Sequence, residues 1–461
     1  MGAEPVEMQT RVFALASGLR QRILAGNLAE GATMPPVREL ARNNRVSTFT
    51  ASRAYDLLVA EGLVDARRGM GYYVAQNARG FHPMEVTASE ADSDSITMGG
   101  QEYCSRSIQL DAGCGCLPPS WLSAEGVRTA LLRISRRPAA YVSRYGNPYG
   151  LPALRRHLAA ALAQRAIECS EEQIIVTQGA SQALELCIRV LARSGETVLV
   201  DDPCYPYVLA MLQARGIRAV GIPRTAAGPD PRILHSTASA TRARVFITNT
   251  TFHNPTGTTI SREVADNILM IARHNGMTIL EDDVFAELNK NRSRSLASLD
   301  PQHSVIYVGS FSKTLSPNLR VGFIAASGDC LEKIAILKNV TSLSSSELAE
   351  QIVLSSLASG QHRAHLESLQ SRLACSYEEV TRRLTDTGAE LPFQGAGIFI
   401  WAKLPTRLHS AEIMELARQR GILLAPGRMF RPGSQPSDYF RFNVAYANDD
   451  LLYSFIRSLP P

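Results

Sequence analysis

The stretch that most constrains this chain is SVIYVGSFSKTLSPNLRVG, residues 304–322. It begins with β-branched and aromatic residues, the pattern of a buried strand, and continues through Lys313 into a Pro-Asn turn. Burial of an ammonium is costly, and desolvation lowers a lysine pKa and frees the amine to form a Schiff base. Ser310 and Arg320 could hold a phosphate beside it. A surface lysine is the alternative, but Lys313 is the only one of the five lysines that follows a serine by three residues and precedes an arginine by seven.

Length, charge and cysteine content restrict the class of protein. A chain of 461 residues predicts two or three domains, and its net charge of +5 permits nucleic acid binding without establishing it. The eight cysteines form no Cys-x-x-Cys pair, so we expect reduced thiols and no metal site. We find no signal-peptide pattern and no apolar run of about 18 residues, so we expect a cytoplasmic protein without a membrane span.

Residues 1–78 have the pattern of three helices and a hairpin. Ser47 suits the N-cap of a third helix at 48–61, and Gly69 lies at the tip of a hairpin over 63–74. The inward face of that helix is expected to contain Ala51, Ala54, Tyr55, Leu58 and Val59. This order predicts a winged helix-turn-helix, an α+β domain whose third helix lies in the major groove of double-stranded DNA.

The segment MPPVRELARNNRVSTFTASRAYDLLVAEGLVDARRGMGYYV closely resembles the DNA-binding domain of GntR-family transcription regulators. Thr48 differs from the arginine that many members use to touch DNA, which leaves the operator sequence open. A winged helix that contacts only proteins is the alternative reading. The expected DNA contacts are Arg38, Ser47, Thr48, Thr50, Ser52, Arg53, Arg68 and Gly69.

Residues 79–108 have no hydrophobic period and many small polar residues, so they predict a linker. From residue 109 to 461, helical and strand patterns alternate, which predicts an α/β domain with a mainly parallel sheet.

Three stretches of this larger domain carry chemistry. A strand, a glycine turn and a helix surround Gly179, and a helix start with free N–H groups favours a phosphate. Asp282 ends an apolar strand, where a buried carboxylate needs a partner, and Asp283 must point to the opposite face. Arg441 lies on a strand of apolar residues and suits a bidentate clamp on a carboxylate, with a surface arginine as the alternative.

Together these stretches resemble a fold-type-I aminotransferase that uses pyridoxal 5′-phosphate (PLP), over roughly residues 110–461, with a smaller C-terminal α+β subdomain. The resemblance implies that Lys313 is the catalytic lysine that binds PLP, that Asp282 pairs with the pyridine nitrogen, and that Arg441 binds the α-carboxylate of an amino acid. It assigns the remaining cofactor contacts to Gly179, Ala180, Ser181, Tyr205, Asn254, Ser310, Arg320 and, from the partner subunit of a homodimer, Tyr145.

One position departs from the pattern of this family. Relatives carry a tyrosine three residues after the aspartate, where this chain has Phe285. The change removes a hydrogen-bond donor to the phenolic oxygen of PLP and should alter the reactivity of the lysine adduct.

A GntR head joined to an aminotransferase-like domain resembles a MocR-type regulator. The leading hypothesis is a PLP-binding transcription regulator that senses an amino acid or amine. A catalytically active aminotransferase with a DNA-binding head is the second hypothesis, and a regulator whose effector is PLP itself is the third. Effector, operator, target genes and the sign of regulation stay open.

Overall fold

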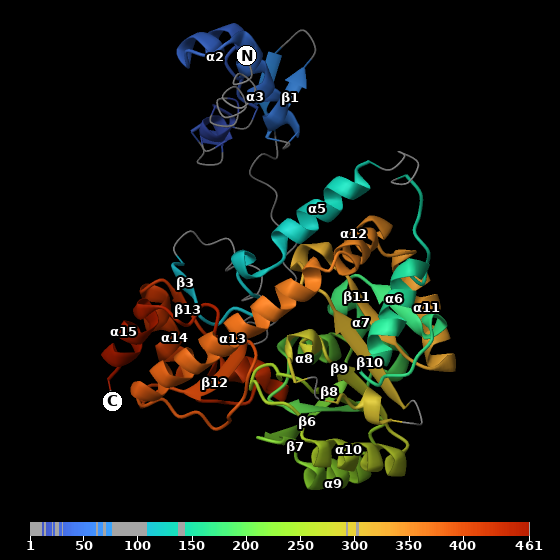
Figure 1. Cartoon of the computed structure of the whole chain (residues 1–461). Helices are drawn as coiled ribbons and strands as arrows, with labels where there is room; N and C mark the ends of the chain where they lie inside the picture. Colours follow the sequence, from blue (N-terminus) through green and yellow to red (C-terminus); the bar gives the residue numbers. More distant parts are fainter. Residues whose placement is uncertain are drawn as a thin grey trace. The chain divides into compact units, whose positions relative to one another are not determined.

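The computed structural model describes residues 12, 15–20, 22–23, 27–29, 31–60, 63–67, 71–75, 108–136, 143–291, 294–300 and 304–460. The chain divides into two compact units, Met1–Ala91 and Asp92–Pro461, which we call the head and the body (Figure 1). No helix in the described ranges is long and apolar enough to cross a bilayer.

The head contains a helix-turn-helix and a two-stranded wing. Its elements are α2 (Val37–Asn43), α3 (Thr48–Ala60), β1 (Val64–Arg67) and β2 (Gly71–Val74). The two strands are antiparallel, with Val64 opposite Val74. Ser47 Oγ accepts a hydrogen bond from the Thr50 N–H at 3.0 Å, as the N-cap prediction requires.

The head core forms where α3 packs against the wing. Ala51, Ala54, Tyr55 and Leu58 are buried as predicted, and the Tyr55 ring stacks on Tyr72 with 4.3 Å between centroids. The prediction for Val59 is wrong, since this side chain is 36% exposed. Leu58 already fills the inward position of that turn, and a helix turns its next residue about 100° away.

Leu58→Ala should destabilise the head without affecting the body. Leu58 is fully buried, and truncating such a leucine costs about 2–5 kcal/mol. We expect hydrogen exchange of the α2 and α3 amides to rise sharply while body amides keep their protection. Val59→Ala is the matched control and should leave exchange nearly unchanged. Equal effects of the two substitutions would contradict this description of the head core.

The large lobe of the body is built on an eight-stranded sheet in the order β4-β11-β10-β9-β8-β5-β6-β7. The strands are β4 (Ile174–Thr177), β5 (Thr197–Asp202), β6 (Arg218–Thr225), β7 (Gly228–Pro229), β8 (Val245–Asn249), β9 (Thr278–Asp282), β10 (Val305–Ser310) and β11 (Gly322–Ala325). The central pairs from β10 to β6 are parallel, whereas β11 and β7 pair antiparallel with their neighbours. The predicted mainly parallel sheet is therefore confirmed.

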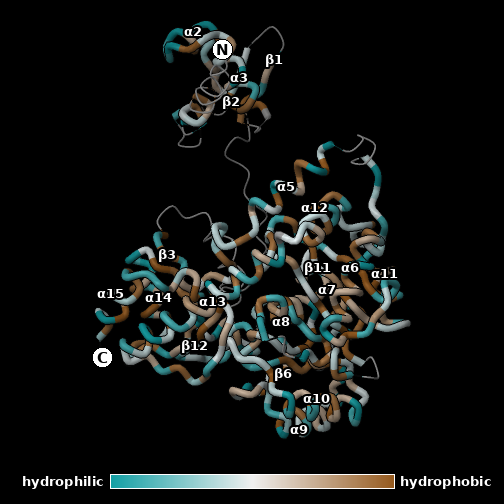
Figure 2. Tube along the Cα trace, viewed as in Figure 1, coloured by the Kyte–Doolittle hydropathy of each residue, from teal (hydrophilic) through white to brown (hydrophobic). Residues whose placement is uncertain are grey.

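Helices cover both faces of this sheet, because successive strand residues point to opposite sides. Val198 and Val200 pack on one face, which α7, α8 and α11 cover, and Leu199 packs on the other, with α9 and α10. Apolar residues concentrate in these layers (Figure 2). The helices of the lobe are α5 (Ala124–Ile134), α6 (Pro152–Ala163), α7 (Gly179–Leu191), α8 (Pro206–Ala214), α9 (Pro231–Thr241), α10 (Arg262–Asn275), α11 (Gly328–Ser342) and α12 (Glu347–Ala358).

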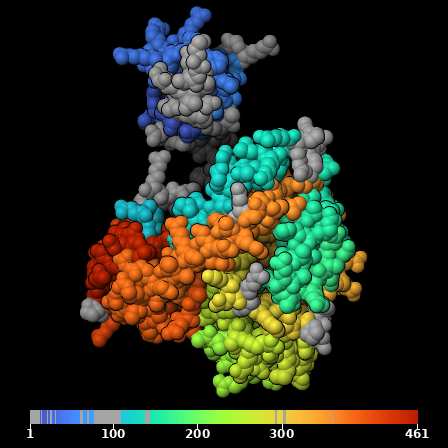
Figure 3. Space-filling view, in the orientation of Figure 1, coloured from blue at the N-terminus to red at the C-terminus, as the bar shows by residue number. Residues whose placement is uncertain are grey.

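The small lobe contains the C-terminal part of the chain and the strand β3 from the start of the body. Its elements are β3 (Leu110–Asp111), α13 (Gln361–Asp386), β12 (Phe399–Lys403), α14 (Ser410–Gln419), β13 (Ile422–Leu423), β14 (Ala425–Pro426), β15 (Tyr439–Asn443) and α15 (Asp450–Ser458). They form the sheet β12-β15-β14, the parallel pair β13-β3 and one shared apolar core. The C-terminal part of this lobe, orange to red, lies beside the green and yellow part of the large lobe in Figure 3.

Candidate functional site

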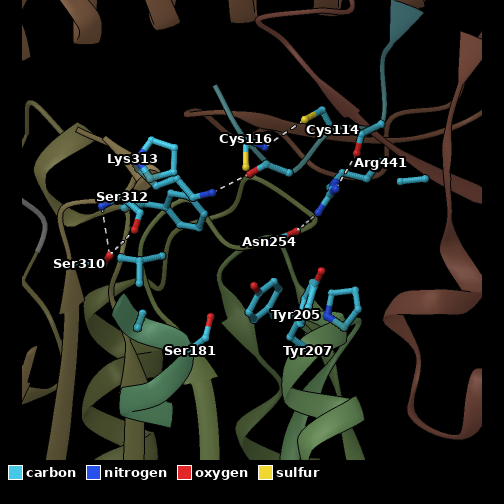
Figure 4. Close-up of a pocket in the computed structure, with 18 of the residues that line it drawn as sticks. Cys114, Cys116, Ser181, Tyr205, Tyr207, Asn254, Ser310, Ser312, Lys313 and Arg441 are labelled. Atoms are coloured by element: carbon cyan, nitrogen blue, oxygen red, sulfur yellow. Dashed lines mark hydrogen bonds between the residues drawn. The ribbon is translucent and has the colours of Figure 1, made fainter. Parts of the chain in front are cut away.

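The carboxyl ends of β9 and β10 open into a cavity of about 360 Å³ between residues of the two lobes. Ligands of open α/β sheets bind at such strand ends. The cavity is lined by Ala180, Ser181, Tyr205, Asn254, Asp282, Ser310, Lys313, Arg320 and Arg441, all predicted from the sequence. Figure 4 shows side chains from both lobes converging on this space. Gly179 lies beside Arg320 rather than at the wall, and Tyr145 is 82% exposed.

Lys313 projects into the cavity just beyond the end of β10. Its ammonium donates a 2.7 Å hydrogen bond to the carbonyl of Gly115 (Figure 4). Burial lowers the pKa of Lys313 below its ordinary value. The structure therefore holds an amine that loses its proton more readily than a surface lysine does, as a Schiff-base nucleophile requires.

Asp282 and Asp283 point to opposite faces of the sheet, as predicted. Burial raises the pKa of Asp282 to about 7, and this carboxyl lines the cavity. Asp283 instead accepts a 2.9 Å hydrogen bond from Arg165 and a 3.2 Å bond from the Tyr307 hydroxyl. Asp282 is thus the carboxyl of this pair that faces a ligand.

Arg441 is buried at the other end of the cavity, so the alternative of a surface arginine is wrong. Its guanidinium donates to Asn254 Oδ1 at 2.9 Å and to the Gly113 carbonyl at 2.6 Å, while its Nε atom has no hydrogen-bond partner within the described part of the chain. It lies over the rings of Phe399 and Phe430. A buried cation with an unused N–H is suited to bind an anion.

Hydrogen-bond donors from Arg320, Ser310 and Ser312 lie near the start of α7. Arg320 Nη1 lies 3.5 Å from Ser312 Oγ, and the Ser312 N–H donates to Ser310 Oγ at 3.1 Å. Gly179 has a φ of +78°, and a Cβ atom there would collide with the Arg320 guanidinium. Glycine is therefore required for the close approach of Arg320 to the helix N-terminus, an arrangement suited to phosphate.

Tyr205 and Phe285 supply aromatic surface to the cavity wall. The Tyr205 ring lies 5.4 Å from that of Tyr207, between centroids, and burial raises the pKa of its hydroxyl. Phe285 packs edge-on against Phe399, with centroids 5.8 Å apart. Phe285, which stands where the resemblance predicts a tyrosine, is therefore held in the apolar core of the small lobe.

The predicted DNA contacts of the head divide into three groups. Arg38, Ser47, Thr48 and Arg53 are exposed, and Ser52 is half-buried. Thr50 is only 4% exposed, and its hydroxyl hydrogen-bonds with that of Ser47 at the start of α3. Both observations speak against its predicted contact with DNA. Arg68 and Gly69 lie outside the described residues.

Two family models account for both units of the chain. Residues 123–459 match the model described as aminotransferase class I and II. Residues 14–74 match the bacterial regulatory proteins of the gntR family. The chain belongs to the class I and II aminotransferase family. With its gntR-type head it has the domain composition of a MocR-type transcription regulator.

Similar proteins support the same domain composition. The chain is 29% identical to the uncharacterized HTH-type transcriptional regulator YdfD of Bacillus subtilis, over 94% of this chain and 92% of that protein. It is 27% identical to the vitamin B6 salvage pathway transcriptional repressor PtsJ of Salmonella typhimurium, over 94% and 93%. Kynurenine aminotransferase of Pyrococcus horikoshii matches with a TM-score of 0.73 and 25% identity, over 81% of this chain and 93% of that one.

Sequence reasoning missed the loop that closes the cavity of this MocR-type chain. The carbonyls of Gly113 and Gly115 accept hydrogen bonds from Arg441 and Lys313, respectively. Those of Cys114 and Cys116 both accept from Asn443 Nδ2. The run Gly-Cys-Gly-Cys was the only sequence signal of this loop, and we interpreted it by its thiols although its backbone carries these contacts.

In the described ranges, no group of three or more His, Cys, Asp or Glu side chains could hold a metal ion.

Glu287 was also missed, although it ends the acidic cluster that follows β9. Its carboxylate accepts a 2.7 Å hydrogen bond from Thr314, the neighbour of Lys313, and lies 3.6 Å from His362 Nε2 on α13. Gln370 of α13 donates to its carbonyl at 2.8 Å. Glu287 thus connects the Lys313 segment with the helix that packs into the small lobe.

Proposed function

We propose that this regulator binds PLP covalently through Lys313 and responds to an amino acid or amine that enters the same cavity. The observation that carries the proposal is the convergence of a half-buried lysine, a buried aspartate and an arginine at a helix N-terminus on one space. When bound, PLP supplies an aldehyde carbon that condenses with amines and a ring that accepts electrons.

The residues present fit this cofactor. Asp282 would hold the pyridine N–H, the ring of Tyr205 would stack on the cofactor, and the Asn254 amide would donate to the phenolic oxygen. Arg320, Ser310, Ala180, Ser181 and the helix start at Gly179 would hold the phosphate. The Gly179 cradle, which a Cβ would fill, supports this assignment.

The effector's carboxylate would bind Arg441, whose Nε has no hydrogen-bond partner among the residues that the structure describes. An effector shifts a regulator only if it binds the two arrangements of the body unequally. Arg441 belongs to the small lobe and Lys313 to the large lobe, so a ligand held by both biases how the lobes close. We propose that this closure controls the DNA-binding head.

A homodimer is part of the proposal. Tyr145 is 82% exposed, and Ile336, Val340 and Leu343 at the end of α11 are more than half exposed. Such apolar exposure is typical of a surface that another chain covers. The partner subunit would then receive Tyr145 at its cofactor phosphate. We further propose that the regulator works in the cytoplasm, since it must reach double-stranded DNA.

The direct test is to add PLP to the purified full-length chain and record the visible absorption, then reduce with borohydride and map the modified peptide. We expect a yellow protein with the adduct on Lys313. A DNA-shift assay on the chain's own upstream region, with a panel of amino acids, then tests regulation. A colourless protein with no trapped adduct would contradict PLP binding.

The stability of the PLP-free body should depend on pH through Asp282. Its pKa rises from about 4 in the unfolded chain to about 7 in the fold, so ionisation opposes folding and stability is lost as pH rises through this range. Asp282→Asn removes this effect. The wild type should lose about 2 kcal/mol of its free energy of unfolding between about pH 5 and about pH 8 through this group, whereas Asp282→Asn should not. The difference in free energy of unfolding between variant and wild type should therefore grow by about 2 kcal/mol in favour of the variant.

Tryptophan fluorescence during urea unfolding measures this change, because both tryptophans, Trp121 and Trp401, belong to the body. Asp266→Asn, which alters an exposed ion pair with Arg262, is the matched control. PLP should reduce the pH dependence of the wild type, since the pyridine N–H gives ionised Asp282 a partner. A pH-independent difference between Asp282→Asn and wild type would count against the assignment.

Catalytic transamination is the second candidate function, favoured by the fold of the body and by the presence of nearly all the groups that the reaction needs. Phe285 argues against it, because a phenyl ring donates no hydrogen bond to the phenolic oxygen of PLP. Steady conversion of an amino acid and a keto acid at ordinary enzyme rates would establish it. Loss of DNA affinity on adding PLP alone would instead support PLP as the effector.

A further inference from the structure

Asp111 is a carboxylate of the cavity wall that the proposed cofactor does not use. It ends β3, which pairs in parallel with β13 so that Asp111 lies opposite Leu423. The chain that follows is fixed against the small lobe, since a Cβ atom on Gly113 would lie 2.7 Å from the Leu424 carbonyl carbon. Backbone pairing therefore holds Asp111 in the part of the cavity where Arg441 would bind the effector.

Four of the five charged side chains that line the cavity already have a proposed role. Lys313, Arg320 and Asp282 are assigned to the cofactor, and Arg441 is assigned to the effector's carboxylate. Asp111 is the charged lining residue that remains in the described part of the chain. Arg441 donates its hydrogen bonds to Asn254 and Gly113, so it acts on Asp111 only electrostatically.

The wall that contains Asp111 also has an apolar part. Leu423, which lies opposite Asp111, lines the cavity together with Leu424 and Met429. Such a wall accommodates a chain of methylene groups, and methionine adapts to its shape. The Cys114 thiol hydrogen-bonds to the Asp111 carboxylate, which orients it beside this apolar surface.

Resting on the function proposed above, we infer that the effector is a monocarboxylic amino acid whose aliphatic side chain ends in a cationic group, and that Asp111 selects it. A terminal ammonium would pair with Asp111 in a partly desolvated site, where a hydrogen bond between charged groups changes affinity by about 10- to 100-fold. A terminal carboxylate would face like charge, and it would give Asp111 no cationic partner.

Three amino acids with the same number of carbon atoms test this selection in the full-length, PLP-loaded protein. L-lysine ends in an ammonium, L-norleucine in a methyl and L-2-aminoadipate in a carboxylate. Calorimetry and the DNA-shift response measure affinity. We expect lysine to bind about 10- to 100-fold more tightly than norleucine, and aminoadipate to bind most weakly. Tightest binding of norleucine or aminoadipate would overturn the inference, as would binding of none of them to a yellow protein.

Asp111→Asn separates charge recognition from a structural role, because asparagine keeps the shape and can still accept the Cys114 hydrogen bond. We expect the affinity for lysine to fall to that for norleucine, while the affinity for norleucine changes by less than about 3-fold. Equal weakening of both ligands would show that Asp111 only supports the fold and would refute its selective role. A protein that stays colourless with PLP would contradict the proposed function itself, so the two failures are distinguishable.

Discussion

Replacing Lys313 by alanine should abolish covalent PLP binding and every effector response while DNA binding without effector persists. Lys313 supplies the amine that the cavity holds beside Asp282, and alanine has no group that can replace it. Absorption spectra should show no visible band with PLP, and borohydride should trap no adduct. DNA affinity should stay within about 3-fold of wild type, because the head is a compact unit separate from the body that contains Lys313.

Lys333→Ala is the control for this substitution, since Lys333 is exposed on α11. It should leave the visible band, the trapped adduct and the DNA shift unchanged. Loss of DNA binding together with the band in Lys313→Ala would show that the head depends on the cofactor for its own fold. That outcome would contradict the modular organisation proposed here.

The second large effect is expected for Arg441→Gln. Arg441 is buried, and removing one partner of a buried charge pair costs about 2–5 kcal/mol, a loss of about 30-fold or more in effector affinity. Because its proposed role is to bind a carboxylate, the loss should affect an amino acid but not the corresponding amine that lacks the carboxylate. Titration of one such pair against the PLP-loaded protein, followed by the change in visible absorption, measures both affinities.

Arg441→Lys is the matched variant. It keeps the charge but loses the planar fork of donors, so we expect an affinity between those of wild type and Arg441→Gln. Arg441 also anchors the Gly113 carbonyl and Asn254, so a structural effect must be separated from recognition. If the amino acid and the amine weaken equally in Arg441→Gln, the residue supports the cavity wall and does not recognise the carboxylate.

Local patterns determined much of this protein from the sequence alone. A run of β-branched and aromatic residues identified β10, a hydroxyl N-cap identified the start of α3, and alternating elements identified a mainly parallel sheet. These features depend on short stretches of chain, and the geometry of strands and helices gives them a fixed meaning. The opposite directions of Asp282 and Asp283 followed for the same reason.

Only the tertiary structure decided which groups meet across long sequence distances. The Gly115 carbonyl reaches Lys313 across 198 residues, and Arg441 Nη2 reaches the Gly113 carbonyl across 328. Backbone carbonyls have no sequence signature, and the burial of Thr50 and exposure of Val59 depend on what packs against α3. Asp111 is one aspartate among many in the sequence, and the pairing of β3 with β13 is what places it in the cavity.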